Sequence, residues 1–151
     1  MADKGNETRI VKDYWDLSAY SWTIEAEGLK LLTEGLKERK ILGRRCHKCK
    51  TVYVPGQKFC RKCLVDIDEV VEVGQEGEVV TYTVGLADIR GEPLEEPIIS
   101  VVVKLDGSDS WMMGILNDID WKEVKVGMRV KLVLKEETKG ELADIVGFVP
   151  A

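Results

Sequence analysis

Two short motifs, Cys46-His47-Lys48-Cys49 and Cys60-Arg61-Lys62-Cys63, decide the fold of the first half of this chain. Each motif is a CxxC pair, and ten residues separate the two pairs. This spacing lets two tight turns bring four thiolates around one metal ion. Four cysteine ligands around zinc leave no open position for a reactive water. The motifs therefore predict a structural zinc site whose ligands are Cys46, Cys49, Cys60 and Cys63.

Two other interpretations of the four cysteines stay open. The same ligand set binds iron in rubredoxin-like sites, and a CxxC pair can also act as a redox dithiol. His47 is the only histidine of the chain, and with four cysteines present we expect it to be a solvated residue of the first motif and not a ligand. A closed set of four cysteines favours structural zinc over both alternatives.

The cysteine motifs lie in a strongly basic stretch of an acidic chain. The net charge of the 151 residues is −5, yet residues 44–63 carry seven basic residues and no acidic one. Zinc bound by four thiolates would lower this local charge to about +5. Such a surface either is simply solvated or attracts phosphate groups. If it binds the phosphates of a nucleotide cofactor, the expected contacts are Lys48, Lys50, Lys58 and Arg61.

Nucleic acid is the alternative ligand for a basic ribbon. The second half of the chain argues against it, because residues 76–151 have a net charge of −7 and few aromatic residues. Binding of single strands needs a basic groove with stacking aromatic side chains. We therefore regard a nucleic-acid-binding module as the weaker hypothesis. It predicts an affinity that falls steeply with salt.

The N-terminal part is predicted to contain a helix from about Thr23 to Lys40. Acidic residues stand in its first turn and basic residues in its last, which suits the helix dipole. Gly28 and Gly35 weaken this helix by up to about 1 kcal/mol each. An aromatic segment precedes it, and we expect this segment either to fold over its own domain or to dock on another chain. Its large side chains are Tyr14, Trp15, Leu17, Tyr20 and Trp22.

The second half has the pattern of a small β domain. Five stretches are rich in β-branched residues and separated by turn signals, at 78–84, 98–105, 110–116, 128–134 and 142–148. Five short strands suit a closed OB-fold barrel, with an open sandwich as the alternative. Residues 87–97 are predicted to be a long acidic connection between the first two strands. The fold class is thus mainly β, with an N-terminal helical arm (1–43), a zinc ribbon (44–66) and an OB-fold barrel (67–151).

Length, composition and motifs limit the possible functions. The chain fits one domain or two small ones, and no apolar run is long enough to cross a bilayer or to resemble a signal peptide. Free cysteines without these signals predict a cytoplasmic protein. No nucleophile with a histidine base and no phosphate-binding glycine loop is visible outside the cysteine motifs. We expect that the chain is not catalytic alone.

The order of features also resembles a known family. The helical leader, the two CxxC pairs, the segments 77–83, 126–130 and 148–150, and Pro97 before a Val-rich strand are similar to zinc-ribbon and OB-fold proteins long classed as a domain of unknown function. The resemblance covers roughly residues 22–150 and implies a rubredoxin-like zinc ribbon. Two departures are Val54-Pro55-Gly56, where the family often has paired prolines, and Ile98, where it often has an aromatic residue.

The resemblance carries functional expectations. Members of this family typically accompany thiolases or related acyl-CoA enzymes as accessory subunits that help to hold the CoA ester. The expected function is therefore a non-catalytic zinc-binding subunit of a thiolase-type acyl-CoA complex. Its expected partners are a thiolase-like protein and a CoA ester. Only the four cysteines match family positions residue by residue.

Overall fold

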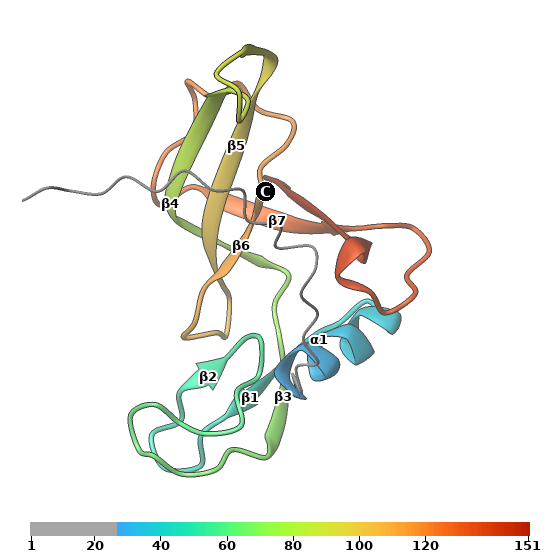
Figure 1. The fold of residues 1–151 in the computed structure, drawn as a ribbon. Coiled ribbons are helices and arrows are strands. Elements are labelled where there is room, and N and C mark those ends of the chain that lie inside the picture. The colour runs from blue at the N-terminus through green and yellow to red at the C-terminus, as the bar shows by residue number, and fades with distance from the viewer. Residues whose placement is uncertain (1–26) are drawn as a thin grey trace, which may run out of the picture.

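The computed structural model describes residues 27–151, and the chain forms a small ribbon sheet, a larger barrel and one helix against both (Figure 1). The predicted helix start at Thr23 and the aromatic residues 14–22 lie outside the described part. No helix among the described residues is long and apolar enough to cross a membrane. The elements in chain order are α1 (Glu27–Lys37), β1 (Ile41–Arg45), β2 (Val52–Tyr53), β3 (Glu69–Val73), β4 (Glu76–Ala87), β5 (Pro93–Leu105), β6 (Met112–Ile115), β7 (Arg129–Leu134), the 3-10 turn η2 (Leu142–Asp144) and β8 (Ile145–Pro150).

The C-terminal half is the predicted five-stranded OB-fold. Its strands are antiparallel in the order β6-β5-β4-β7-β8. A parallel bridge between Leu116 and Phe148 joins the two outer strands and closes the sheet into a barrel. The last strand begins at Ile145, three residues later than predicted, because residues 142–144 form a 3-10 turn whose Asp144 side chain is buried.

The ribbon is a three-stranded antiparallel sheet in the order β2-β1-β3. These strands were not predicted from the sequence, because each is short and none has a long alternating pattern. Five residue pairs join β1 to β3, from Ile41 opposite Val73 to Arg45 opposite Glu69. The hydrogen-bonded ribbon thus continues past residue 66, where the sequence-based division places the start of the barrel domain.

The prediction of a long connection at 87–97 is wrong. β4 and β5 form one hairpin: their pairing runs to Gly85 opposite Ile98 and, after an irregular stretch, resumes at Ala87 opposite Pro93. Only residues 88–92 lie between the two strands. Prolines and acidic residues suggested a loop, but the cross-strand pairing of Val84 with Ile99 and of Gly85 with Ile98 extends the ladder into this segment.

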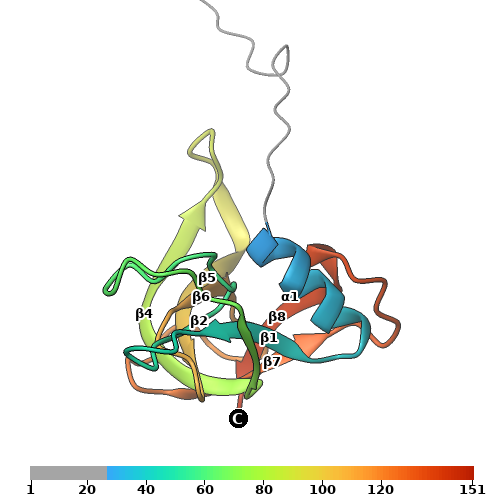
Figure 2. The same cartoon turned by 90° about the horizontal axis from the view of Figure 1, so that it is seen from below.

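One apolar core joins the helix, the ribbon and the barrel. Leu32 and Leu36 of α1 and Ile41 of β1 are buried in the same cluster as Val73 and the barrel residue Phe148. Figure 2 shows α1 lying beside β1 and β8, so the helix covers the junction of the two sheets. Because the core is continuous, the ribbon and the barrel pack as one unit.

Two glycines that weaken α1 are required by close packing. A Cβ atom at Gly28 would lie 2.0 Å from the backbone oxygen of Gly56. At Gly35 it would lie 2.7 Å from the Leu42 side chain. The helix ends at Lys37, earlier than the predicted Lys40, because Arg39 adopts a left-handed conformation with φ of 58°. The two glycines lower the helix propensity of α1, but they allow the helix to pack closely against the ribbon.

Replacement of Gly28 by alanine tests this contact. Propensity alone predicts that Gly28→Ala stabilises the helix by up to about 1 kcal/mol. We expect the opposite, a lower free energy of unfolding, because the added Cβ would meet Gly56 backbone that cannot move without displacing the ribbon. Urea unfolding measures the change. The control is Glu34→Ala at an exposed helix position, and a stability of Gly28→Ala equal to or above the parent would contradict the expectation.

A buried carboxylate organises the turn before β8. The Oδ2 atom of Asp144 accepts hydrogen bonds from the backbone N–H groups of Lys139 at 2.9 Å, Gly140 at 2.7 Å and Glu141 at 2.8 Å. These bonds, led by that of Glu141, hold the pKa of Asp144 below its usual value, although burial opposes the shift. The ionised carboxylate therefore stabilises the folded state.

This carboxylate should make stability depend on pH. Since the folded-state pKa is lowered, its stabilisation is complete above the unfolded pKa of about 4 and is lost as the pH falls through the folded value. We expect Asp144→Asn to be less stable than the parent at pH 7. The difference between the two should shrink below about pH 4. Urea midpoints of both proteins between pH 2.5 and 7 check this, and a difference independent of pH would contradict it.

Candidate metal centre

Two loops of the same shape carry the four cysteines. In the first, the N–H of Cys46 donates to Thr51 O at 2.9 Å, and the N–H of Lys50 donates to Cys46 O at 2.9 Å. In the second, the N–H of Cys60 donates to Val65 O at 2.8 Å, and that of Leu64 donates to Cys60 O at 2.8 Å. The residue after the second cysteine has a positive φ in both loops, 61° at Lys50 and 53° at Leu64. These loops are two equivalent metal knuckles.

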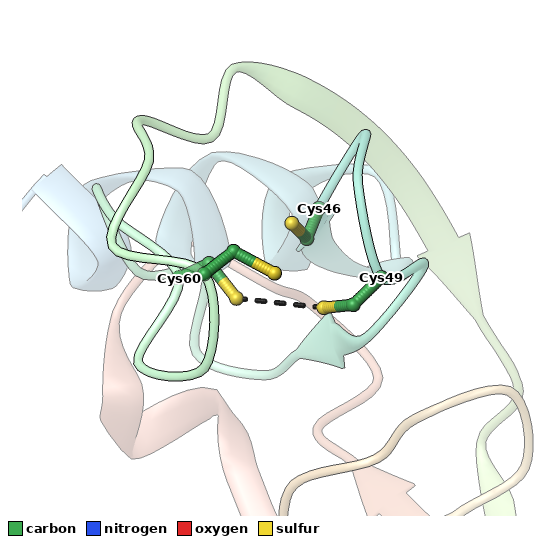
Figure 3. A group of neighbouring side chains, drawn as sticks. Cys46, Cys49 and Cys60 are labelled. Carbon is green, nitrogen blue, oxygen red and sulfur yellow. Dashed lines mark hydrogen bonds between the residues drawn. The ribbon is translucent and has the colours of Figure 1, made fainter.

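The knuckles bring the four sulfur atoms together. Their Sγ atoms all lie within 4.8 Å of one another, and those of Cys49 and Cys60 are 3.5 Å apart. Figure 3 shows Cys46, Cys49 and Cys60 converging from the two loops. A tetrahedral zinc ion with Zn–S distances of about 2.3 Å places its sulfur ligands about 3.8 Å apart. The arrangement of these free thiols therefore fits one such ion.

Hydrogen bonds around the sulfur atoms change the acidity of the thiols. The Tyr53 hydroxyl, 3.5 Å from the Cys60 sulfur, lowers the pKa of Cys60 to about 6, and the same contact raises the pKa of Tyr53 to about 12. The Thr51 hydroxyl lowers the pKa of Cys49. The hydrogen bond with Cys49, together with burial, raises the pKa of Cys63 to about 12. A bound metal cation would deprotonate Cys63 in spite of this raised pKa, because metal ligation deprotonates a thiol.

Sequence reasoning missed the residues that support the centre. Tyr53 is 7% exposed and shares a small core with Cys46, Cys60 and Ile67. Its position in the two-residue strand β2 gave no signal in the sequence. The hydroxyl of Thr51 also accepts a hydrogen bond from Lys62 Nζ at 3.3 Å. Neither Tyr53 nor Thr51 is a metal ligand, but the Tyr53 hydroxyl contacts the Cys60 sulfur and the Thr51 hydroxyl contacts the Cys49 sulfur.

A loop of the barrel holds β2, an edge strand of the ribbon sheet. The N–H of Val52 donates to Asp109 Oδ2 at 2.9 Å, and the N–H of Val54 donates to Ser110 Oγ at 2.6 Å. In return, the Ser110 hydroxyl donates to Val54 O at 2.9 Å. These bonds fix β2 to residues 108–110. The position of the metal centre is therefore set partly by the barrel.

The predicted phosphate contacts are exposed but do not form one group. Lys48 and Lys50 lie on the first knuckle and Arg61 on the second. Lys58 instead lines a hollow of about 540 Å³ with Arg44, His47, Asp66, Ile67 and Asp68. Two carboxylates thus balance the two cations of this hollow. The positive charge of the ribbon is spread over the knuckle surfaces and is not focused in a single cavity.

The knuckles and the closed barrel define the class of protein. It is a zinc-ribbon protein with a C-terminal OB-fold, in which four cysteines form the zinc-ribbon site. Family comparisons agree with this class. Residues 33–69 match the rubredoxin-like zinc ribbon domain of ChsH2, and residues 70–135 match its C-terminal OB-fold domain. The chain therefore belongs with the ChsH2-type zinc-ribbon and OB-fold proteins of the DUF35 family.

Individual relatives share this organisation. A DUF35 domain-containing scaffold protein of Methanocaldococcus jannaschii is 28% identical over 102 residues, which cover 66% of this chain and 72% of the relative. A solved DUF35 protein of unknown function from Sulfolobus solfataricus has a TM-score of 0.65 and 25% identity, covering 80% of this chain and 82% of its own. A solved chain of the Ltp2-ChsH2(DUF35) aldolase has a TM-score of 0.58 and 26% identity, covering 79% and 91%.

The left-handed residue of the second knuckle provides a test of the loop geometry. Leu64 is 79% exposed, so its side chain contributes little packing, yet its positive φ costs a residue with a Cβ about 1–2 kcal/mol. We expect Leu64→Gly to be more stable to urea than Leu64→Ala by about 1 kcal/mol in the zinc-loaded protein. Leu64→Ala is the matched control because it removes the same side chain and keeps the Cβ. Equal stability of the two variants would contradict the knuckle geometry.

Proposed function

We propose that this chain is a non-catalytic, zinc-binding subunit of a thiolase-type acyl-CoA enzyme complex. The observation that carries the proposal is the match of both domains to ChsH2, together with a solved relative that belongs to an aldolase named with two components, Ltp2 and ChsH2. A second relative is named a scaffold protein. The catalytic groups then belong to the partner enzyme, and this chain supports its assembly.

The role of zinc in this proposal is structural. Cys46, Cys49, Cys60 and Cys63 are its ligands, and four thiolates leave no coordination position for substrate or water. The ion holds the two knuckles in place and supplies no chemistry of its own. The proposal places the subunit in the cytoplasm, where thiols stay reduced and available for the metal.

Binding of the CoA ester is the second part of the proposal. Lys48, Lys50, Lys58 and Arg61 are exposed cations of the ribbon, and they would contact the phosphates at the adenosine end of CoA. Cations of this kind hold phosphates by charge and hydrogen bonds. The barrel and the β4–β5 hairpin would cover the thioester end and exclude water from it. Because carboxylates balance the hollow at Lys58, the knuckle residues carry most of the expected effect.

Charge reversal of the four cations tests the CoA assignment. In the reconstituted complex, the variant with Lys48, Lys50, Lys58 and Arg61 all replaced by Glu should raise the KM for the CoA substrate at least tenfold. We expect a smaller change in kcat, because the reacting groups belong to the partner. Steady-state kinetics of the complex measure both constants.

A matched control reverses four lysines of the barrel that are also exposed, namely Lys104, Lys122, Lys125 and Lys131. It changes the net charge by the same amount and should leave the KM near the parent value. An unchanged KM in the ribbon variant, with complex assembly intact, would show that the ribbon cations do not bind CoA. Absence of any acyl-CoA enzyme from the native complex would refute the proposed function itself.

A further inference from the structure

The hairpin of β4 and β5 extends beyond the rest of the barrel sheet. β4 pairs with β7 only from Glu76 to Glu78, and its last bonds on that side join Val79 to Gly127 and Met128. Beyond Val79, no strand within residues 27–151 pairs with β4 on this side. Alternate residues of an antiparallel strand point their N–H and C=O groups away from the partner strand. Residues 80–87 therefore present an open backbone edge.

This edge lacks the charges and prolines that usually protect a strand, and its pairing with β5 is irregular only between Val79 and Thr81 and between Gly85 and Ala87. Residues 79–87 read Val-Val-Thr-Tyr-Thr-Val-Gly-Leu-Ala and contain no charged residue and no proline. Natural proteins block exposed edges with lysines, other charges or prolines, because an open edge pairs with other chains. An uncharged edge of eight residues with high β propensity can thus pair with a strand of another chain.

The opposite edge of the same hairpin is protected. β5 pairs with β6 from Ser100 onward, and Ile99 O accepts a hydrogen bond from the N–H of Leu116, so residues 93–98 of β5 are also an outer edge. That stretch contains two prolines and two acidic residues, Pro93, Pro97, Glu95 and Glu96. The chain therefore blocks one edge and leaves the other open, although both belong to one projecting hairpin.

Hydrogen bonds within the hairpin hold its tip in one shape. At its tip, the Asp88 carboxylate accepts hydrogen bonds from the N–H groups of Arg90 at 2.8 Å and Glu92 at 2.9 Å. Gly91 supplies the positive φ of 86° that the turn needs. Leu86 is 55% exposed and Ile89 is fully exposed. Figures 1 and 2 both show this tip projecting away from the rest of the molecule.

We propose that residues 80–87 of β4 bind an extended strand of a partner protein by β-strand addition, and that basic residues flank this strand. The inference rests on the proposed function, because it assigns the edge to the enzyme subunit of the complex. Main-chain hydrogen bonds supply affinity in this mode, and side-chain contacts such as those of Leu86 and Ile89 supply specificity.

The charge of the hairpin indicates which kind of strand binds to the β4 edge. Residues 86–98 carry four acidic residues and one arginine, a net charge of −3. Pairing of two copies of this chain along β4 would bring two such hairpins side by side and would be opposed by repulsion. A strand with flanking Lys or Arg has the complementary charge. The partner is thus a different protein with a basic extended segment.

Hydrogen exchange tests the edge directly. The full chain is measured alone and within the native complex that contains its acyl-CoA enzyme. Amides in peptides covering 80–87 should exchange at least tenfold more slowly in the complex, whereas those covering 93–98 should change less. Equal exchange of 80–87 in the two states, with the enzyme bound, would overturn the edge assignment and leave the proposed function standing.

A pair of lysine substitutions provides the second measurement. Thr83 is exposed on the edge, and Thr83→Lys adds a protecting charge there; we expect it to weaken binding of the enzyme subunit at least tenfold. Val126→Lys adds the same charge at a position that is 64% exposed outside the hairpin and should bind as the parent does. Equal affinities of the two variants would overturn the proposal.

Two further outcomes also overturn it. A concentration-dependent dimer of the chain alone, abolished by Thr83→Lys, would assign the edge to a second copy. A native complex without an acyl-CoA enzyme would remove the proposed function and the partner assignment together. Circular dichroism of both variants confirms that folding is intact before binding is compared.

Discussion

The convergence of four sulfur atoms is the constraint on which the ribbon depends. Val52 and Val54 belong to the main core, and the small core of the ribbon itself contains only four buried hydrophobic residues, Cys46, Tyr53, Cys60 and Ile67, two of which are metal-site cysteines. Burial of so little apolar surface cannot offset the ordering of some twenty residues, which costs about 1–2 kcal/mol each. Metal–thiolate bonds supply the missing stabilisation, since zinc binding of this kind is folding free energy.

The ribbon in turn depends on its neighbours for orientation. Cys46 directly follows β1, and Ile41 at the start of β1 lies in the core shared with the barrel, so one short strand connects the metal site to the main core. The bonds of Asp109 and Ser110 to the backbone of β2 add a second connection. The side chains of Arg129 and Asp106 form a bidentate ion pair on the barrel, and Asp106 O accepts a hydrogen bond from the N–H of Gly74, which lies between β3 of the ribbon and β4 of the barrel. Several weak constraints thus give one defined orientation.

The sequence predicted the parts whose signal is local. Motif spacing identified the four cysteines that the fold brings together, and β-branched runs located all five barrel strands. The ribbon strands were missed, because β1 and β3 are only five residues each and become strands by pairing across 23 intervening residues. The prolines and acidic residues of 87–97 predict a loop. In the structure those of residues 93–97 lie in β5, where they protect an edge and do not end the strand. The role of Tyr53 was not predicted, because its contact with the Cys60 sulfur forms only when the chain is folded.

The continuous core has a mechanical consequence for assembly. Figure 1 places the metal knuckles at one end of the molecule and the tip of the β4–β5 hairpin at the other. Since α1, the ribbon and the barrel share one core, the two ends are held at a fixed separation. A large partner that contacts both ends is bound at two sites. Once the first contact has formed, the second forms at a high effective concentration. Two contacts that are weak separately can in this way produce a long-lived complex, provided that the spacing on the partner matches.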